Sequence, residues 1–389
     1  MLLYFGVSGF LSFFEWQEMY LMPTPGARLK GTKYEHNFHL DVKNRPMKSV
    51  VLFGDNASGK SNWIYALRHL VMLILNGLHV HNTELFHYRS HSVCFKISIC
   101  NKGREFDYEL EYNRSGVVLR ESFRQDEQEI FSFADESLNL TAAVNKRTSL
   151  QELFSRKSTD TLLKKLRDWL AEPISEFRNI VSQILVEAEE PIHWGMEFLP
   201  LMSLEADELN IVKEYSDDAK KILQFVDPTI SDIFFEEMIN PEGHTRYQPY
   251  LNRKDSGIAK KFAMSFESQG IKKAIYLLPQ LLQIYKGKTV VIDNLDSSIG
   301  IKSLIRIFNS VIHSPTNTKG QLIVSSHNLH LLNLDMFHET QLQVFSKGDD
   351  LGSVVHGIDR YDYRTVKRNL DEICLRGGFD SRSVLENPY

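Results

Sequence analysis

The stretch VLFGDNASGKSN, at positions 51 to 62, constrains the fold of this 389-residue chain more strongly than its composition does. A β-branched apolar run leads into a loop of small residues that ends in Gly-Lys-Ser. The spacing Gly54-x-x-x-x-Gly59-Lys60-Ser61 fits the phosphate-loop pattern, in which a loop between a strand and a helix surrounds a phosphate. We therefore predict a buried strand at residues 48 to 53, the loop, and a helix that Gly77 ends.

Each residue type in such a loop has a physical role. Glycines let backbone N–H groups approach the phosphates, the lysine reaches the β- and γ-phosphates, and the hydroxyl of Ser61 ligates Mg²⁺. An incidental glycine-rich turn is the alternative, but the flanking strand and helix disfavour it. The predicted nucleotide contacts are Gly54, Asn56, Ser58, Gly59, Lys60, Ser61 and Asn62.

The segment TVVIDNLD (289 to 296) supplies a carboxylate after a second apolar strand. Asp293 is the expected partner of Mg²⁺ together with Ser61, and the next position normally holds a Glu that polarises the attacking water. Here that position is Asn294, and losing a general base typically costs ~10²–10⁴ in rate, so we predict slow hydrolysis. Three alternatives remain open: Asp296 takes over, Asn294 orients water as a Gln does in some GTPases, or the Asn is a substitution that traps nucleotide.

Two further motifs follow the same logic. His327 lies directly after a predicted strand (321 to 326) and can donate to a γ-phosphate, although a lone His at a strand end is usually structural. Ser268 and Gly270, in FESQG, open a predicted helix and offer a hydroxyl and bare backbone to an anion. An ordinary Ser N-cap is the alternative for that pair.

The order of elements predicts an α/β fold. Strand-length pieces at residues 92 to 133 predict an antiparallel meander, and strand–helix alternation after residue 271 predicts a parallel sheet covered by helices. The expected strands and helices there are a helix at 271 to 285, a strand at 289 to 293 and a helix at 301 to 312. The predicted division is an N-terminal part with the phosphate loop and antiparallel sheet (1 to 145), a largely helical insertion with a short hairpin at 240 to 257 (146 to 262), and a C-terminal part of the same core (263 to 389).

Charge and cysteine content limit the partners. The net charge of −5 is mixed along the chain, which argues against a dense basic face for nucleic acid. We expect Lys164, Lys165, Arg167, Lys260 and Lys261 to be solvated. Three cysteines favour a reducing compartment, and without a signal peptide or a membrane span we expect a cytoplasmic protein.

Histidines are crowded after the predicted first helix. His79, His81, His87, His91 and Cys94 lie within sixteen residues. His87 and His91 are four residues apart, as on a metal-binding helix face, but regular finger spacing is missing. A polar loop is therefore favoured over a zinc site.

The motifs, in this order, resemble those of ABC-type ATPases of the SMC, RecF and OLD lineage. Within that lineage the chain is most similar to bacterial abortive-infection AAA-family ATPases, through YFGVSGFLSF, FDYELEY, TQLQVFSKGDDLGS and LDEICLRGGFDSRSV. The resemblance spans nearly the whole chain and is weakest in the middle. It implies an ABC-type P-loop ATPase core that uses ATP and Mg²⁺.

The resemblance also implies partners. Ser268 of one subunit would cover the nucleotide held by the Lys60 loop of another, so ATP would join a homodimer or a higher oligomer. The implied role is a nucleotide-gated sensor in anti-phage defence that controls a separate toxin or nuclease and responds to a phage-derived trigger. Two alternatives remain open: a RecF- or SMC-like repair ATPase that binds DNA, and an ATP-binding scaffold with little hydrolysis, which Asn294 favours.

Overall fold

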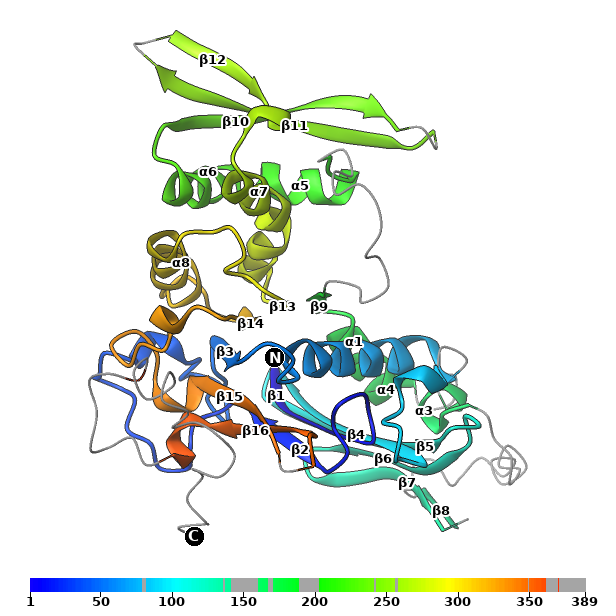
Figure 1. The fold of residues 1–389 in the computed structure, drawn as a ribbon. Coiled ribbons are helices and arrows are strands. Elements are labelled where there is room, and N and C mark those ends of the chain that lie inside the picture. The colour runs from blue at the N-terminus through cyan, green and yellow to red at the C-terminus, as the bar shows by residue number, and fades with distance from the viewer. Residues whose placement is uncertain are drawn as a thin grey trace.

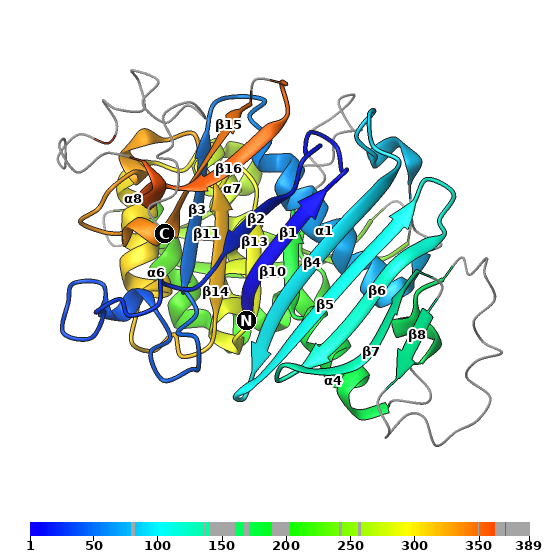
Figure 2. The same cartoon turned by 90° about the horizontal axis from the view of Figure 1, so that it is seen from below.

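A computed structural model describes residues 1–78, 82–135, 137–140, 160–166, 171–188, 203–240, 243–255, 258–348, 350–361 and 370. Figure 1 shows three sheets with helices packed between them. A small sheet lies at one end, a central sheet in the middle and a long antiparallel sheet at the other end. Figure 2 shows the long antiparallel strands beside the central sheet.

The central sheet has six strands in the order β16-β15-β3-β14-β13-β9. The strands from β15 to β9 are parallel, and β16 pairs antiparallel with β15. Their bounds are β3 Ser49–Gly54, β9 Ile184–Glu187, β13 Thr289–Ile292, β14 Gln321–Ser325, β15 Leu342–Lys347 and β16 Ser353–Gly357. The predicted α/β fold with a parallel sheet is confirmed. Because β3, β14 and β13 are neighbours and parallel, the segments that follow them meet at one edge of the sheet.

Helices cover both faces of this sheet. Side chains of a strand alternate in direction, so Leu52 of β3 packs in one core and Phe53 in another. The first core contains α1 (Lys60–Asn76), and the second contains α7 (Gln269–Leu282). Burial on both faces explains why β3 is apolar nearly throughout.

The helices agree with the sequence pattern. The N–H of Gly77 donates to Leu73 O at 2.7 Å and ends α1 as predicted. The helix expected at 301 to 312 forms as α8 (Ile301–Ile307), followed by a π-helical turn at Phe308–Ile312. Within the described ranges, no helix is both long enough and apolar enough to cross a membrane.

The antiparallel sheet has seven strands in the order β2-β1-β4-β5-β6-β7-β8. Its bounds are β1 Leu2–Ser8, β2 Gln17–Tyr20, β4 Ser92–Asn101, β5 Arg104–Asn113, β6 Val118–Gln125, β7 Gln128–Ala134 and β8 Ser137–Leu140. The meander predicted at residues 92 to 133 is thus confirmed. Two short helices, α3 (Leu162–Lys165) and α4 (Ala171–Val181), pack on it, and the Phe177 ring of α4 lies 5.1 Å from that of Phe123.

The segment expected to be a largely helical insertion differs from that expectation. Its helices α5 (Ala206–Glu214) and α6 (Ser216–Val226) are followed by a three-stranded antiparallel sheet of β10 Ile230–Ile239, β11 Thr245–Asp255 and β12 Ile258–Ala263. The prediction of a short hairpin at 240 to 257 is wrong, because the turn near Asn240 joins the two long strands β10 and β11. Aromatic and β-branched residues such as Ile233 and Phe235 face the helices, and this packing favours strands.

Another part of that segment belongs to the central sheet. The strand β9 pairs with β13, with Ile184 opposite Thr289. The sequence predicts a helical insertion here, and pairing with β13 overrides that expectation.

Some sequence predictions lie outside the described residues. They concern His79, His81, Arg167, and the closing stretch except Leu370. The side chains of Lys260 and Lys261 are outside as well.

Candidate functional site

The phosphate-loop segment has the backbone that its glycines predict. Gly54 has φ 146° and Gly59 has φ 112°, conformations that side chains rarely adopt. A Cβ on Gly59 would lie 2.2 Å from Ser353 Oγ, and one on Gly54 would lie 2.3 Å from Phe345 O. Neither position therefore tolerates a larger residue.

Lys60 lies at the start of α1 and points back into the loop. Its Nζ donates to Gly54 O at 2.7 Å and to Asp55 O at 2.9 Å. Burial lowers the pKa of Lys60 to about 8, although the carboxylates of Asp293, Asp55 and Asp296 oppose this shift. The ammonium group thus lies where the loop would hold a phosphate, with acceptors that an anion can replace.

Asp293 follows β13 and is 3% exposed. Ser325 Oγ, at the end of β14, donates to Asp293 Oδ1, and the N–H of Asn294 donates to Ser325 Oγ at 2.8 Å. Ser325 thereby fixes both the carboxylate and the backbone of the next residue. Asn294 itself has φ 51°, in the left-handed region that Asn tolerates better than most residues.

His327 joins these two segments to the loop. Its Nδ1 lies 3.4 Å from Lys60 Nζ, and its backbone N–H donates to Asp296 Oδ2 at 3.2 Å. The structure therefore brings Lys60 together with three residues that lie more than 230 positions later in the sequence: Asp293, Asp296 and His327.

The loop also fits a phosphate and a hard cation. Ser58 Oγ is buried and makes no hydrogen bond, while Asn56 and Ser61 are exposed. The hydroxyl of Ser61 and the carboxylate of Asp293 are oxygen donors, which Mg²⁺ prefers alongside phosphate oxygens. Among the residues that the structure describes, no three His, Cys, Asp or Glu side chains form a metal cluster, so the zinc alternative gains no support from His87, His91 and Cys94.

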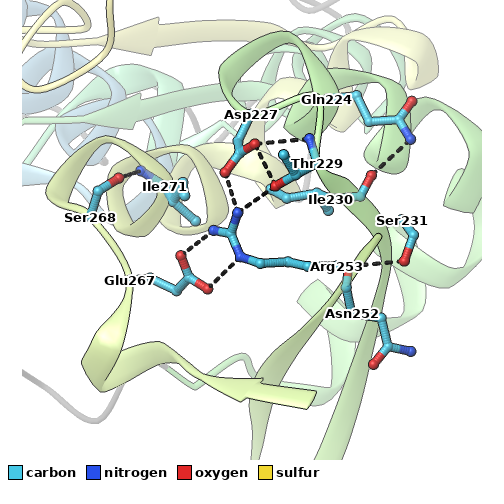
Figure 3. Close-up of polar contacts among 10 residues, drawn as sticks. All are labelled: Gln224, Asp227, Thr229, Ile230, Ser231, Asn252, Arg253, Glu267, Ser268 and Ile271. Atoms are coloured by element: carbon cyan, nitrogen blue, oxygen red, sulfur yellow. Dashed lines mark hydrogen bonds and ion pairs between the residues drawn. The ribbon is translucent and has the colours of Figure 1, made fainter. Parts of the chain in front are cut away.

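Ser268 and Gly270 lie at the start of α7. Ser268 Oγ accepts from the N–H of Ile271 at 3.4 Å, as an N-cap does (Figure 3). Gly270 packs against the loop that follows Asp293, since a Cβ there would lie 2.6 Å from Ser298 O. In the described part of the chain, Ser268 accepts hydrogen bonds from Ile271 and Lys272 of its own helix, so its role toward a nucleotide stays a prediction.

Sequence reasoning missed a set of hydroxyl contacts beside the loop. Asn62 Nδ2 donates to Ser12 Oγ at 2.8 Å, and Ser353 Oγ donates to the same oxygen at 2.7 Å. Lys347 Nζ lies 3.3 Å from Ser353 Oγ. These residues come from three distant segments, and no local pattern around Ser12 or Ser353 indicates that they meet. Ser325 was missed for the same reason.

Comparison with known proteins gives one family. The family model described as "AAA domain, putative AbiEii toxin, Type IV TA system" matches residues 49–333. No curated protein matches the sequence.

Several solved structures have a similar course of the chain at low identity. An SMC head bound to the C-terminal winged-helix domain of ScpA is 14% identical over 91% of this chain and 96% of its own, with a TM-score of 0.49. The SMC head of Thermotoga maritima is 13% identical over 92% and 98%, with a TM-score of 0.44. A Pyrococcus furiosus SMC head bound to the C-terminal domain of ScpA is 13% identical over 96% and 99%, with a TM-score of 0.45.

Proposed function

The chain belongs to this family of AAA domains, and from that premise we propose that it is a nucleotide-gated ATPase that binds Mg-ATP between two copies of itself. The observation that carries the proposal is the convergence of Lys60 with His327, Asp293 and Asp296 at the carboxyl ends of three adjacent parallel strands. A positive group, a buried carboxylate and an imidazole at one sheet edge are the groups needed to hold a triphosphate and its metal ion.

Each group would have a separate task. The loop residues Gly54, Asn56, Ser58, Gly59 and Asn62 would surround the phosphates, with Lys60 on the β- and γ-phosphates. Ser61 and Asp293 would hold Mg²⁺, which supplies charge neutralisation to the phosphates. His327 would donate to the γ-phosphate and so distinguish ATP from ADP.

Hydrolysis would be slow. The side chain of Asn294 cannot take a proton from the attacking water. ATP would therefore stay bound long enough to act as a signal. Bound ATP would favour a closed assembly, and hydrolysis would favour an open one.

We place this switch in abortive-infection defence. The family description names a toxin of a type IV toxin–antitoxin system, and the sequence resemblance points to the same biology. In this reading the chain restrains or releases a separate toxin or nuclease. A phage product would be the trigger, acting on the closed or open state.

Sedimentation velocity of the full chain tests the proposal. With Mg²⁺ and ATP or a slowly hydrolysed analogue, we expect the chain to associate, and with ADP to remain dissociated. Lys60→Ala should bind no nucleotide and stay dissociated, while Lys30→Ala, which removes an exposed side chain outside the phosphate loop, should behave as the unaltered chain does. The same sedimentation coefficient with and without ATP would contradict the proposed gate.

A further inference from the structure

One arginine links three segments next to Ser268. Arg253 of β11 binds Glu267 through two atoms, with Nη2 at 2.5 Å from Oε2 and Nε at 3.3 Å from Oε1. Its Nη1 also binds Asp227 Oδ2 and donates to Thr229 Oγ1 at 2.6 Å. Figure 3 shows this guanidinium between the two carboxylates.

These contacts fix the position of Glu267. The Glu267 side chain is 5% exposed, and the side chains of Arg253 and Asp227 are about one-fifth exposed, at 19% and 22%. A guanidinium that binds a carboxylate through two atoms sets its orientation as well as its distance. Burial opposes ionisation of Asp227, but bonds from Arg253 and Thr229 outweigh it and lower its pKa below the usual value. The segment before α7 is therefore tied to β11.

That fixed segment holds an aromatic ring in solvent. Met264 is 3% exposed and Glu267 is anchored, while Phe266 between them is 86% exposed. The buried side chains of Met264 and Glu267 hold this segment with the Phe266 ring facing outward. An exposed aromatic residue on a fixed segment is suited to a protein–protein contact, since aromatic residues are enriched at interface cores.

We propose that Met264–Ser268 is a docking segment for a second copy of this chain, with Phe266 as its apolar anchor and Arg253 as the positioning residue that holds it. This inference rests on the proposed function, in which Ser268 faces the phosphate loop of the partner copy. Two residues of extended chain span at most ~7 Å. Phe266 would therefore contact the surface that borders that loop.

That surface exposes apolar side chains. Leu351 is 78% exposed and Tyr88 is 73% exposed. Leu351 lies in the turn before Ser353, which touches Gly59, and the Tyr88 loop bonds to the segment that contains Ser12, through Leu11 N–H to Leu85 O at 2.7 Å. Both side chains are thus on segments that connect to the surroundings of the phosphate loop, and Phe266 of a second copy would contact one of them.

Sedimentation with Mg²⁺ and a slowly hydrolysed ATP analogue tests the anchor. Phe266→Ser should weaken self-association roughly tenfold or more, because truncating a central aromatic anchor has effects of that size. Nucleotide affinity measured at concentrations where the chain is dissociated should not change. The matched control is Ile239→Ser, which removes an apolar side chain that is 71% exposed on β10. It should associate as the unaltered chain does.

A second pair of variants tests the positioning residue. Arg253→Lys keeps the charge but loses the two-atom contact, so association should weaken less than in Arg253→Met. In both variants nucleotide affinity should stay near that of the unaltered chain. A residue that only stabilised the fold would lower both quantities together.

The outcomes separate the two proposals. If the unaltered chain associates with the ATP analogue and Phe266→Ser associates equally, the docking segment is wrong and the nucleotide gate stands. If Arg253→Met associates as the unaltered chain does, the positioning role is wrong. If the unaltered chain fails to associate, both the gate and the docking segment are wrong.

Discussion

Gly270 and Ser298 are in close backbone contact, such that a Cβ on Gly270 would lie 2.6 Å from the Ser298 carbonyl oxygen. Gly270 is in the first turn of α7, and Ser298 is in the loop that follows Asp293. Only glycine permits this approach. The segment proposed to face a second copy is thus in contact with the segment proposed to hold Mg²⁺ in its own copy.

Gly270→Ala should disturb this contact. The added methyl group must push the start of α7 away from Ser298, and overpacking of this kind typically costs ~1–3 kcal/mol. We expect weaker association with Mg-ATP and an unchanged nucleotide affinity of the single chain. Gly300→Ala is the matched control, because a Cβ there meets nothing within 4 Å. Equal association of both variants would show that the contact between Gly270 and Ser298 does not affect the pairing of two copies.

Asn294→Glu should raise the rate of ATP hydrolysis. A carboxylate at this position supplies the missing base, worth ~10²–10⁴ in rate. The left-handed backbone at φ 51° opposes the change by ~1 kcal/mol, so the variant should be slightly less stable. Single-turnover assays compare it with Asn294→Gln, which has the same length and no carboxylate. Equal rates for the two variants would show that Asn294 does not limit hydrolysis.

Binding of ATP should take up protons at pH 8 to 9. Burial lowers the pKa of Lys60 to about 8, so a fraction of the Lys60 side chains is neutral at pH 8 to 9. A bound triphosphate raises this pKa again. Calorimetry in buffers of different ionisation enthalpy measures the uptake. It should fall toward zero for Lys60→Arg, because arginine stays protonated. If the unaltered chain and Lys60→Arg took up the same number of protons, a group other than Lys60 would be their acceptor.

The stability of the chain should depend on Glu121 between about pH 4.5 and about pH 7. Burial raises the pKa of Glu121 to about 7, although N–H donors of Leu163 and Leu162 and the Tyr108 hydroxyl oppose the shift. A raised carboxyl pKa means that the folded chain binds more protons, so its contribution is full below pH 4.5 and is lost as pH rises through about 7.

Glu121→Gln removes this titration. Denaturant unfolding across that pH window should give a smaller slope of stability against pH than in the unaltered chain. Glu129→Gln, at a half-buried position of the neighbouring strand β7, is the control. An unchanged slope in Glu121→Gln would contradict the assignment.

Local patterns made much of the fold and the site predictable. The strand before Gly54, the helix after Lys60 and its end at Gly77 follow from apolar runs and glycines a few residues apart. Asp293 and His327 were placed because each follows an apolar strand, and parallel strands bring such ends together.

Contacts between distant segments were not predictable. Ser325 of β14 donates to Asp293, which follows β13. Arg253 of β11 binds Glu267, and the sequence pattern does not predict the sheet that contains β11. The strands β10 and β11 carry many charged residues, and the sequence pattern predicts a helical insertion with a short hairpin there. Their strand structure depends on packing against α5 and α6, which no local window contains.

Mixing two inactive variants tests most directly whether one nucleotide is held by two copies. Lys60→Ala lacks the loop lysine, and Ser268→Arg blocks the end of α7, so neither alone should associate with Mg²⁺ and the ATP analogue. A mixed pair contains one intact site, formed by Lys60 of one copy and Ser268 of the other. We predict that sedimentation of the mixture shows ATP-dependent pairing, whereas pairing by either variant alone, or no pairing in the mixture, would contradict the account.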